Sequence, residues 1–156
     1  MFNYVGSGGG RRGGSHLETY AATVEQILLA LGVDPVRARL NTEAGFGWSF
    51  QRGSAVIEVY VSQQEDAGYL QVLSPIMHLP QNGLLALYRR LLELNLQLTN
   101  ASIGVYLDVV YLFSERPLEG LDANEANNII TLVAGYADEL DDKLIAEFGG
   151  RLYARI

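Results

Sequence analysis

Residues 45–73 read GFGWSFQRGSAVIEVYVSQQEDAGYLQVL, and this stretch decides the fold. Bulky or apolar side chains recur at every second position, the spacing that places neighbours on opposite faces of a β-strand. The strands predicted from this alternation are 45–51, 55–61 and 69–73. Two short polar segments, 52–54 and 63–68, separate them. Connections this short join antiparallel neighbours, so the stretch predicts a three-stranded antiparallel meander.

Trp48 is the only tryptophan of the chain and lies in the first strand of this meander. It shares its parity with Phe46 and Phe50, and the positions between them carry small residues. So large an apolar surface is costly to leave in water. We therefore expect Trp48 in the core.

Apolar residues at helical spacing flank the meander on both sides. The predicted helices are 15–31, 82–95 and 122–148, and two further strands are predicted at 103–107 and 109–113. Ser15 with Glu18, and Asp122 with Glu125, have the spacing of an N-terminal capping box. The order is therefore α-β-β-β-α-β-β-α. Strands grouped apart from helices predict an α+β domain, an antiparallel sheet of about five strands with helices packed on it.

The domain organisation follows from the glycine content. Residues 1–14 include a glycine-rich run, and glycine loses the most backbone entropy on ordering, so we expect a flexible arm. Residues 15–156 then form one domain, because a chain of 156 residues is in the size range of a single core.

The composition excludes several classes of function. The net charge of −7 argues against a nucleic-acid partner, since phosphate binding needs a basic surface. The chain has no cysteine, and hence no disulfide or thiolate metal site. No apolar run approaches the roughly 20 residues of a membrane span, and the first residues lack a signal-peptide core. We expect a cytoplasmic protein without a membrane partner.

Catalysis and metal binding have little support. His16 and His78 have no serine or carboxylate at a recognisable catalytic spacing. The acidic residues at 138, 139, 141 and 142 lie on a predicted helix, where adjacent side chains diverge, so a solvated face is favoured over a cation site. We expect no enzyme activity, no metal and no cofactor.

One face of the predicted sheet is unusual. If the aliphatic residues of the second strand point at the helices, a set of opposite parity points away. These residues are Val56, Tyr60, Tyr69, Leu73 and Tyr106. A solvent-facing sheet surface normally carries polar residues, and tyrosine is enriched at interfaces. We predict that this set contributes to a dimer or partner interface, with the second helix around Leu85 and Leu92 as the other candidate surface.

Several local phrases carry a resemblance to a known family. They are LLELN at 91–95, LD at 107–108, PLEGLD at 117–122 and FGG at 148–150. With the order of elements, they make residues 15–150 resemble the type III secretion chaperone fold and its YbjN-like relatives. One departure is that Asp108 is not followed by glycine in the predicted hairpin.

The resemblance implies a non-enzymatic homodimer that holds segments of other proteins on its surface, acting as a chaperone or a regulator. Packing on the sheet face or addition of a strand at the sheet edge would cover apolar segments of the partner. The alternative is a small-molecule sensor with a pocket between sheet and helices.

Overall fold

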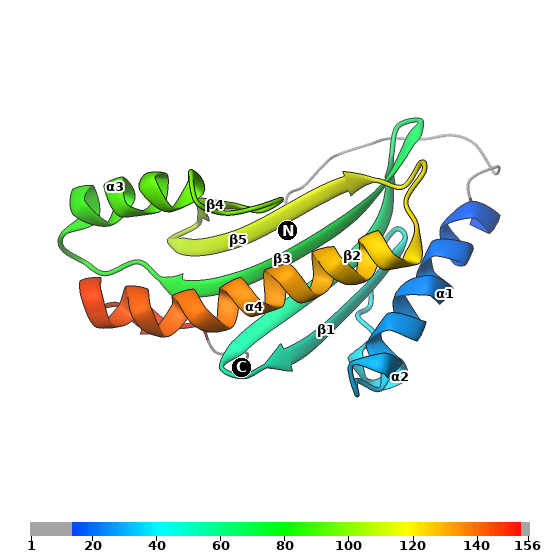
Figure 1. The fold of residues 1–156 in the computed structure, drawn as a ribbon, viewed down its shortest axis with the longest axis horizontal. Helices are drawn as coiled ribbons and strands as arrows, with labels where there is room; N and C mark the ends of the chain where they lie inside the picture. The colour runs from blue at the N-terminus through cyan, green and yellow to red at the C-terminus, as the bar shows by residue number, and fades with distance from the viewer. Residues whose placement is uncertain (1–13, 154–156) are drawn as a thin grey trace.

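The computed structural model describes residues 14–153, with side chains from His16 onward, and has the predicted α+β fold (Figure 1). Its helices are α1 (Gly14–Ala30), α2 (Pro35–Ala38), α3 (Leu84–Asn95) and α4 (Ala123–Phe148). Its strands are β1 (Phe46–Arg52), β2 (Ala55–Gln64), β3 (Ala67–His78), β4 (Ser102–Tyr106), β5 (Val109–Pro117) and β6 (Arg151–Leu152). The predicted arm lies outside the described residues except for Gly14, which begins α1, and the Ser15 side chain lies outside them too.

The strands form one antiparallel sheet in the order β1-β2-β3-β5-β4, and β6 pairs with β3. Figure 1 shows α4 crossing one face of the sheet, with α1 at one end and α3 beside β4 at the other. The described residues place no helix on the opposite face, so the domain has two layers. We refer to that opposite surface as the open face.

The core lies between the sheet and the helices. Trp48 is 0% exposed, which confirms its prediction, and it pairs across β1 and β2 with Val59. Ile57 and Val61 have the same parity and are fully buried. From α4, the core includes Ala126, Ile130, Val133, Ala137 and Leu144. The alternation in 45–73 therefore identified the helix-facing side correctly.

The bounds predicted for the third strand, 69–73, were too short, because β3 continues past Pro75 to His78 through an irregularity between Pro75 and Met77. The β2–β3 pairing stops at Glu58↔Leu73. Proline has no N–H, and at position 75 that N–H would have pointed toward β2 beyond the last pair, so no hydrogen bond of the ladder is lost. Ser74 donates its hydroxyl to the Val56 carbonyl at 2.7 Å, which satisfies the acceptor left without that N–H.

The β4–β5 hairpin turns at Leu107 and Asp108, whose φ angles are 45° and 62°. Two positive φ angles in a two-residue loop match the twist of the flanking strands and normally favour glycine or asparagine. The missing glycine therefore leaves the hairpin intact at some backbone strain. Asp108 also accepts a backbone hydrogen bond from Leu79 at 2.8 Å, which ties the turn to the end of β3.

Candidate protein-binding site

The five residues predicted to share one surface lie on the open face. Tyr60 and Val56 have the parity opposite to the core residues of β2, and the strand register places Tyr69 and Leu73 of β3 beside them. Tyr106 belongs to the same face at the end of β4, where it pairs with Val109 of β5. The strand parity therefore puts all five side chains on one face, but Tyr106 lies beside Val109 at one end of β5, whereas Tyr69 pairs with Pro117 at the other end.

Their exposure is uneven. Val56 and Leu73 are only 2% and 3% exposed, whereas Tyr60 and Tyr69 are half-buried and Tyr106 is exposed. Tyr60 donates its hydroxyl to Glu58 at 2.8 Å. Its ring lies over Gly47, where a Cβ atom would come within 2.9 Å of the ring carbons. The open face thus has a packed aliphatic centre with two half-buried tyrosines beside it, of which Tyr60 is held in place.

A groove of about 300 Å³ hollows the open face above the β4–β5 hairpin. Its lining includes Tyr111, Phe113 and Gly104, and nothing lies within 4 Å of where a Gly104 Cβ would stand. Burial and the neighbouring acidic and phenolic groups raise the pKa of Tyr111, so its hydroxyl stays neutral at physiological pH. We name this the face groove. It can receive an apolar side chain.

A second groove, of about 530 Å³, lies between the end of β5 and the first half of α4. Ile129 and Leu132 give it an apolar floor, and Asn100 and Asn128 border it. We name it the edge groove. Sequence reasoning missed it, because its two walls come from segments that show no common pattern in the chain.

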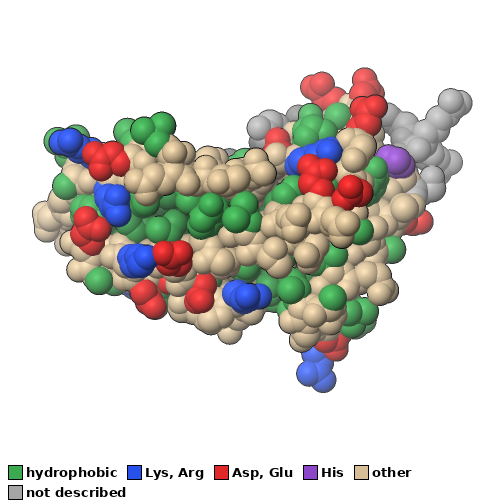
Figure 2. Space-filling view, viewed as in Figure 1, with side chains coloured by type: hydrophobic (Ala, Val, Ile, Leu, Met, Phe, Trp, Pro, Cys, Tyr) green, Lys and Arg blue, Asp and Glu red, His purple; other side chains and the backbone are tan. Residues whose placement is uncertain are grey.

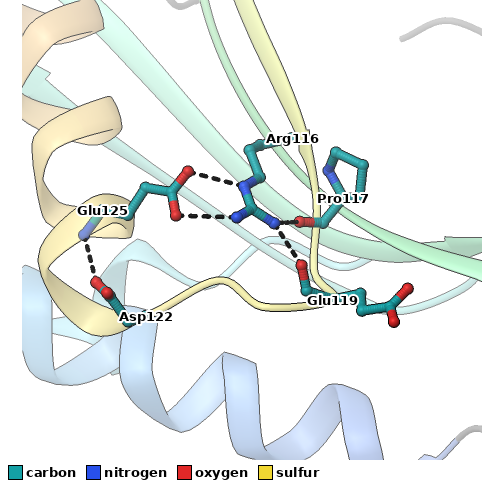
Figure 3. Close-up of polar contacts among 5 residues, drawn as sticks. All are labelled: Arg116, Pro117, Glu119, Asp122 and Glu125. Atoms are coloured by element: carbon teal, nitrogen blue, oxygen red, sulfur yellow. Dashed lines mark hydrogen bonds and ion pairs between the residues drawn. The ribbon is translucent and has the colours of Figure 1, made fainter.

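Arg116 lines the edge groove, and Figure 3 shows its polar contacts. Its Nε and Nη2 atoms donate to the two carboxylate oxygens of Glu125 at 2.8 and 3.0 Å, and Nη1 donates to the carbonyls of Pro117 and Glu119. The carboxylate of Glu125 raises the pKa of Arg116. Asp122 caps α4 as predicted by accepting from the Glu125 N–H at 2.8 Å, while the Glu125 side chain binds Arg116 instead of completing a capping box.

The outer side of α3 carries exposed apolar residues. Leu85, Leu92 and Leu96 are 85%, 69% and 90% exposed, and Tyr88 lies between them at helical spacing. The opposite side of α3 is buried, so the helix has two apolar faces. Figure 2 shows hydrophobic side chains on this end of the molecule and along a strip between α4 and the α3–β4 layer. The exposed outer face of α3 is the alternative interaction surface that the sequence predicted around Leu85 and Leu92.

The acidic residues of α4 do not form the wholly solvated face predicted for them, because Asp141 is only 1% exposed. Its carboxylate accepts from the Ser54 hydroxyl at 2.7 Å, and Asp138 accepts from the Ser54 N–H at 3.1 Å. Both carboxylates therefore hold the β1–β2 turn against α4. Burial raises the pKa of Asp141, opposed by the hydrogen bonds from Ser54 and the Asp142 N–H.

We expect Asp141→Asn to leave the free energy of unfolding at pH 7 unchanged or higher than in the wild type. A carboxyl group whose pKa is raised by folding contributes stability below its ordinary value of 3.8, and this contribution is lost as the pH rises through the folded pKa. The amide keeps partners for Ser54 and Asp142 and carries no charge. Urea denaturation at pH 7 and pH 4 would check this, with the exposed Asp142→Asn as control. A larger loss of stability at pH 7 than at pH 4 would contradict it.

The two histidines lie apart from these surfaces. His16 is exposed on α1 with its ring edge against Tyr20, and His78 stacks on Tyr153 at 5.6 Å. Within residues 14–153, no group of three His, Asp or Glu side chains is placed to hold a metal ion. Among the described helices, none combines the length and hydropathy needed to cross a bilayer.

An antiparallel sheet with one helix-covered face, one open face and a helix with a second apolar side is the architecture of a chaperone-like binding domain. The model of one family, TY-Chap1, described as T3SS (YopN, CesT) and YbjN peptide-binding chaperone 1, matches residues 20–155. The chain belongs to this family, which confirms the resemblance predicted from its sequence phrases. Membership in this family supports a peptide-binding chaperone domain.

A solved structure supports the same fold. The chain is similar to one in the HopA1–SchA chaperone–effector complex, with a TM-score of 0.59 and 10% sequence identity. The similarity covers 82% of this chain and 97% of that one. Among curated proteins, none matches this chain in sequence.

Proposed function

We propose that the protein is a homodimeric, cytoplasmic peptide-binding chaperone, which holds an apolar segment of a partner protein on its open face. The observation that carries the proposal is the open face itself, because the tyrosines Tyr60 and Tyr69 and the aliphatic Val56 and Leu73 lie where a solvated sheet would be polar. The family's description and the fold of a chaperone–effector complex point to the same kind of work.

The face groove supports a partner in an extended conformation. Its walls are aromatic, its floor lacks a side chain at Gly104, and it opens to the surface along β4 and β5. An enclosed apolar cavity between sheet and helices would favour the small-molecule sensor. The face groove and the edge groove are instead open, which suits a peptide. A pocket of about 270 Å³ between α1, α4 and the sheet is the place where the alternative, a small-molecule sensor, would bind its ligand.

The proposal of a homodimer rests mainly on the exposed residues of α3. Exposed leucines on one side of a helix form an apolar patch, and such patches on soluble proteins mark interaction sites. The neighbouring β4–β5 hairpin adds Val105 of β4 and Leu107 of the turn, both exposed. A two-fold axis beside α3 would pair this patch with its own copy and leave the open face to the partner.

The double variant Tyr60→Glu, Tyr69→Glu tests the open face. Peptides selected from a phage-displayed random 12-residue library on the wild-type protein serve as probes, and their binding is measured by fluorescence polarisation. We expect the variant to keep its circular dichroism spectrum and to bind at least about tenfold more weakly, because two buried charges at an interface each cost more than 1 kcal/mol.

The control is Gln26→Glu, Gln81→Glu, which adds the same charge at exposed positions away from the open face. If the tyrosine variant unfolds, Tyr60 and Tyr69 are core residues rather than binding residues. Unchanged binding in a folded variant would place the partner surface elsewhere. Failure of the wild type to select any peptide would reject the chaperone proposal as a whole.

A further inference from the structure

The two outer edges of the sheet are partly closed by groups of the chain itself. At β1, the Gly47 carbonyl accepts from the Leu40 N–H at 2.8 Å. At β4, the Asn95 side chain accepts from the Ile103 N–H at 2.7 Å and donates to its carbonyl at 3.2 Å. Asn95 thus imitates a neighbouring strand. Unpaired edges invite strand addition, and these contacts prevent it at both places.

The tail of β5 differs from these edges. Pairing between β4 and β5 ends at Ser102↔Phe113, while β5 continues to Pro117. Within residues 14–153, no strand lies beside 114–117 on the side that β4 has left. A four-residue segment of sheet edge is therefore open at the edge groove.

The hairpin determines which backbone groups point outward. A two-residue turn makes Tyr106 and Val109 a hydrogen-bonded pair, and such pairs alternate along an antiparallel ladder. Every second residue of β5 from Val109 onward thus directs its N–H and C=O toward the β4 side, and Glu115 is the first of these beyond the end of β4. The alternate residue Arg116 pairs with Leu70 of β3 instead.

The open segment ends abruptly. Pro117 has no N–H, and its carbonyl already accepts from Arg116, as does the carbonyl of Glu119. Glu115 therefore offers one donor and one acceptor, bounded by Phe113 on one side and by the Arg116 cluster on the other. Its side chain lies on the open face at the border of the face groove, where the carboxylate accepts from Gln71 at 2.5 Å.

Two grooves meet at this backbone. The edge groove and the face groove share Ser102, Phe113 and Glu115 in their linings, and they lie on opposite sides of the sheet. Successive side chains of an extended chain point in opposite directions. A strand laid along Glu115 would therefore place one side chain over Ile129 and Leu132 and the next in the face groove.

We propose that the tail of β5 is a strand-addition site for an extended segment of the partner protein, with hydrogen bonds to the Glu115 backbone and alternate apolar side chains in the two grooves. The segment is not acidic, because Glu115 and Glu125 border the site and the chain carries a net charge of −7. This inference rests on the proposed function, for which it names the position and chemistry of the bound peptide.

The test is Glu115→Pro, which removes the outward N–H. Glu115→Ala controls for the lost carboxylate, and Gln51→Pro is the matched control, because Gln51 is also exposed and its N–H points away from the sheet at the β1 edge. With the phage-selected peptides as probes, we expect Glu115→Pro to weaken binding about tenfold, since a hydrogen bond is lost and the proline ring obstructs the incoming strand. Gln51→Pro is expected to stay within about twofold of the wild type. Glu115→Pro is expected to bind more weakly than Glu115→Ala, which lacks the carboxylate but keeps the N–H.

A second comparison does not depend on proline. Leu132→Glu places a charge on the floor of the edge groove and is expected to weaken binding, whereas Leu29→Glu on the exposed side of α1 is not. Hydrogen exchange of the wild type should show the Glu115 amide slowed by peptide. Wild-type affinity in folded Glu115→Pro and Leu132→Glu proteins would overturn the inference even if Tyr60→Glu, Tyr69→Glu loses peptide.

Two other occupants of the edge are distinguishable. Loss of self-association in Glu115→Pro without peptide would make the occupant a second copy of this chain, and the assignment to a partner peptide would be wrong. Fast exchange of the Glu115 amide in the peptide-bound wild type would likewise overturn it. No peptide selected by the wild type would reject both the inference and the function on which it rests.

Discussion

Replacement of Trp48 by alanine is expected to lower the free energy of unfolding by about 3–5 kcal/mol, the usual cost of truncating a large buried aromatic residue. The indole is fully buried between the sheet and the helices. Its ring stacks on Phe46 with centroids 6.3 Å apart, and the Arg39 guanidinium lies 5.3 Å from its centroid, bound in turn to Glu25. Removing the ring leaves a cavity that these neighbours cannot all fill.

Trp48→Phe is the matched control. Among the residues that the structure describes, the Trp48 Nε1 atom has no hydrogen-bond acceptor, so phenylalanine removes a buried unsatisfied donor while it keeps an aromatic ring. We expect Trp48→Phe to lower the free energy of unfolding by less than half as much as Trp48→Ala. Urea denaturation followed by circular dichroism suits both variants, because Trp48 is the only tryptophan. A loss below about 1 kcal/mol for Trp48→Ala would contradict its place in the core.

The strand faces were predictable because alternation is a local property. Of the residues in 45–73 that the pattern assigned to the helix side, Trp48, Ile57, Val59 and Val61 are buried there, and Phe46 and Phe50 are half-buried. The end of β3 was not predictable in the same way, because Pro75 is tolerated inside the strand only where the β2–β3 pairing has stopped, and there the Ser74 hydroxyl satisfies the Val56 carbonyl. The two-residue β6 has no periodicity that could reveal it.

The candidate site, too, was predictable only where a local sequence pattern determined it. Parity placed five residues on the open face, but the burial of Val56 and Leu73 there depends on neighbours across three strands. The open edge at Glu115 comes from unequal strand lengths about the hairpin at Leu107. The sequence did contain one indication of this edge. A hairpin with two strands of equal length would require 98–101 to be a strand, but the composition of this segment is typical of a polar turn.

The double variant Leu85→Glu, Leu92→Glu is expected to convert the proposed dimer to a monomer. Both side chains are exposed in the single chain, so the change leaves the core intact, and glutamate is a good helix former. In a two-fold interface the same patch meets its copy, which brings four new charges together in a desolvated contact. We expect the dissociation constant to rise at least about a hundredfold, as for the loss of two interface hot spots.

Sedimentation equilibrium of the wild type and variants measures this directly. Leu29→Glu on α1 is the control for adding charge at an exposed leucine, and it should leave the dimer intact. The Tyr60→Glu, Tyr69→Glu protein separates the two surfaces, because it should remain dimeric while it loses peptide. If that protein becomes monomeric and the leucine variant does not, the open face is the contact between copies, and α3 becomes the surface that remains for a partner.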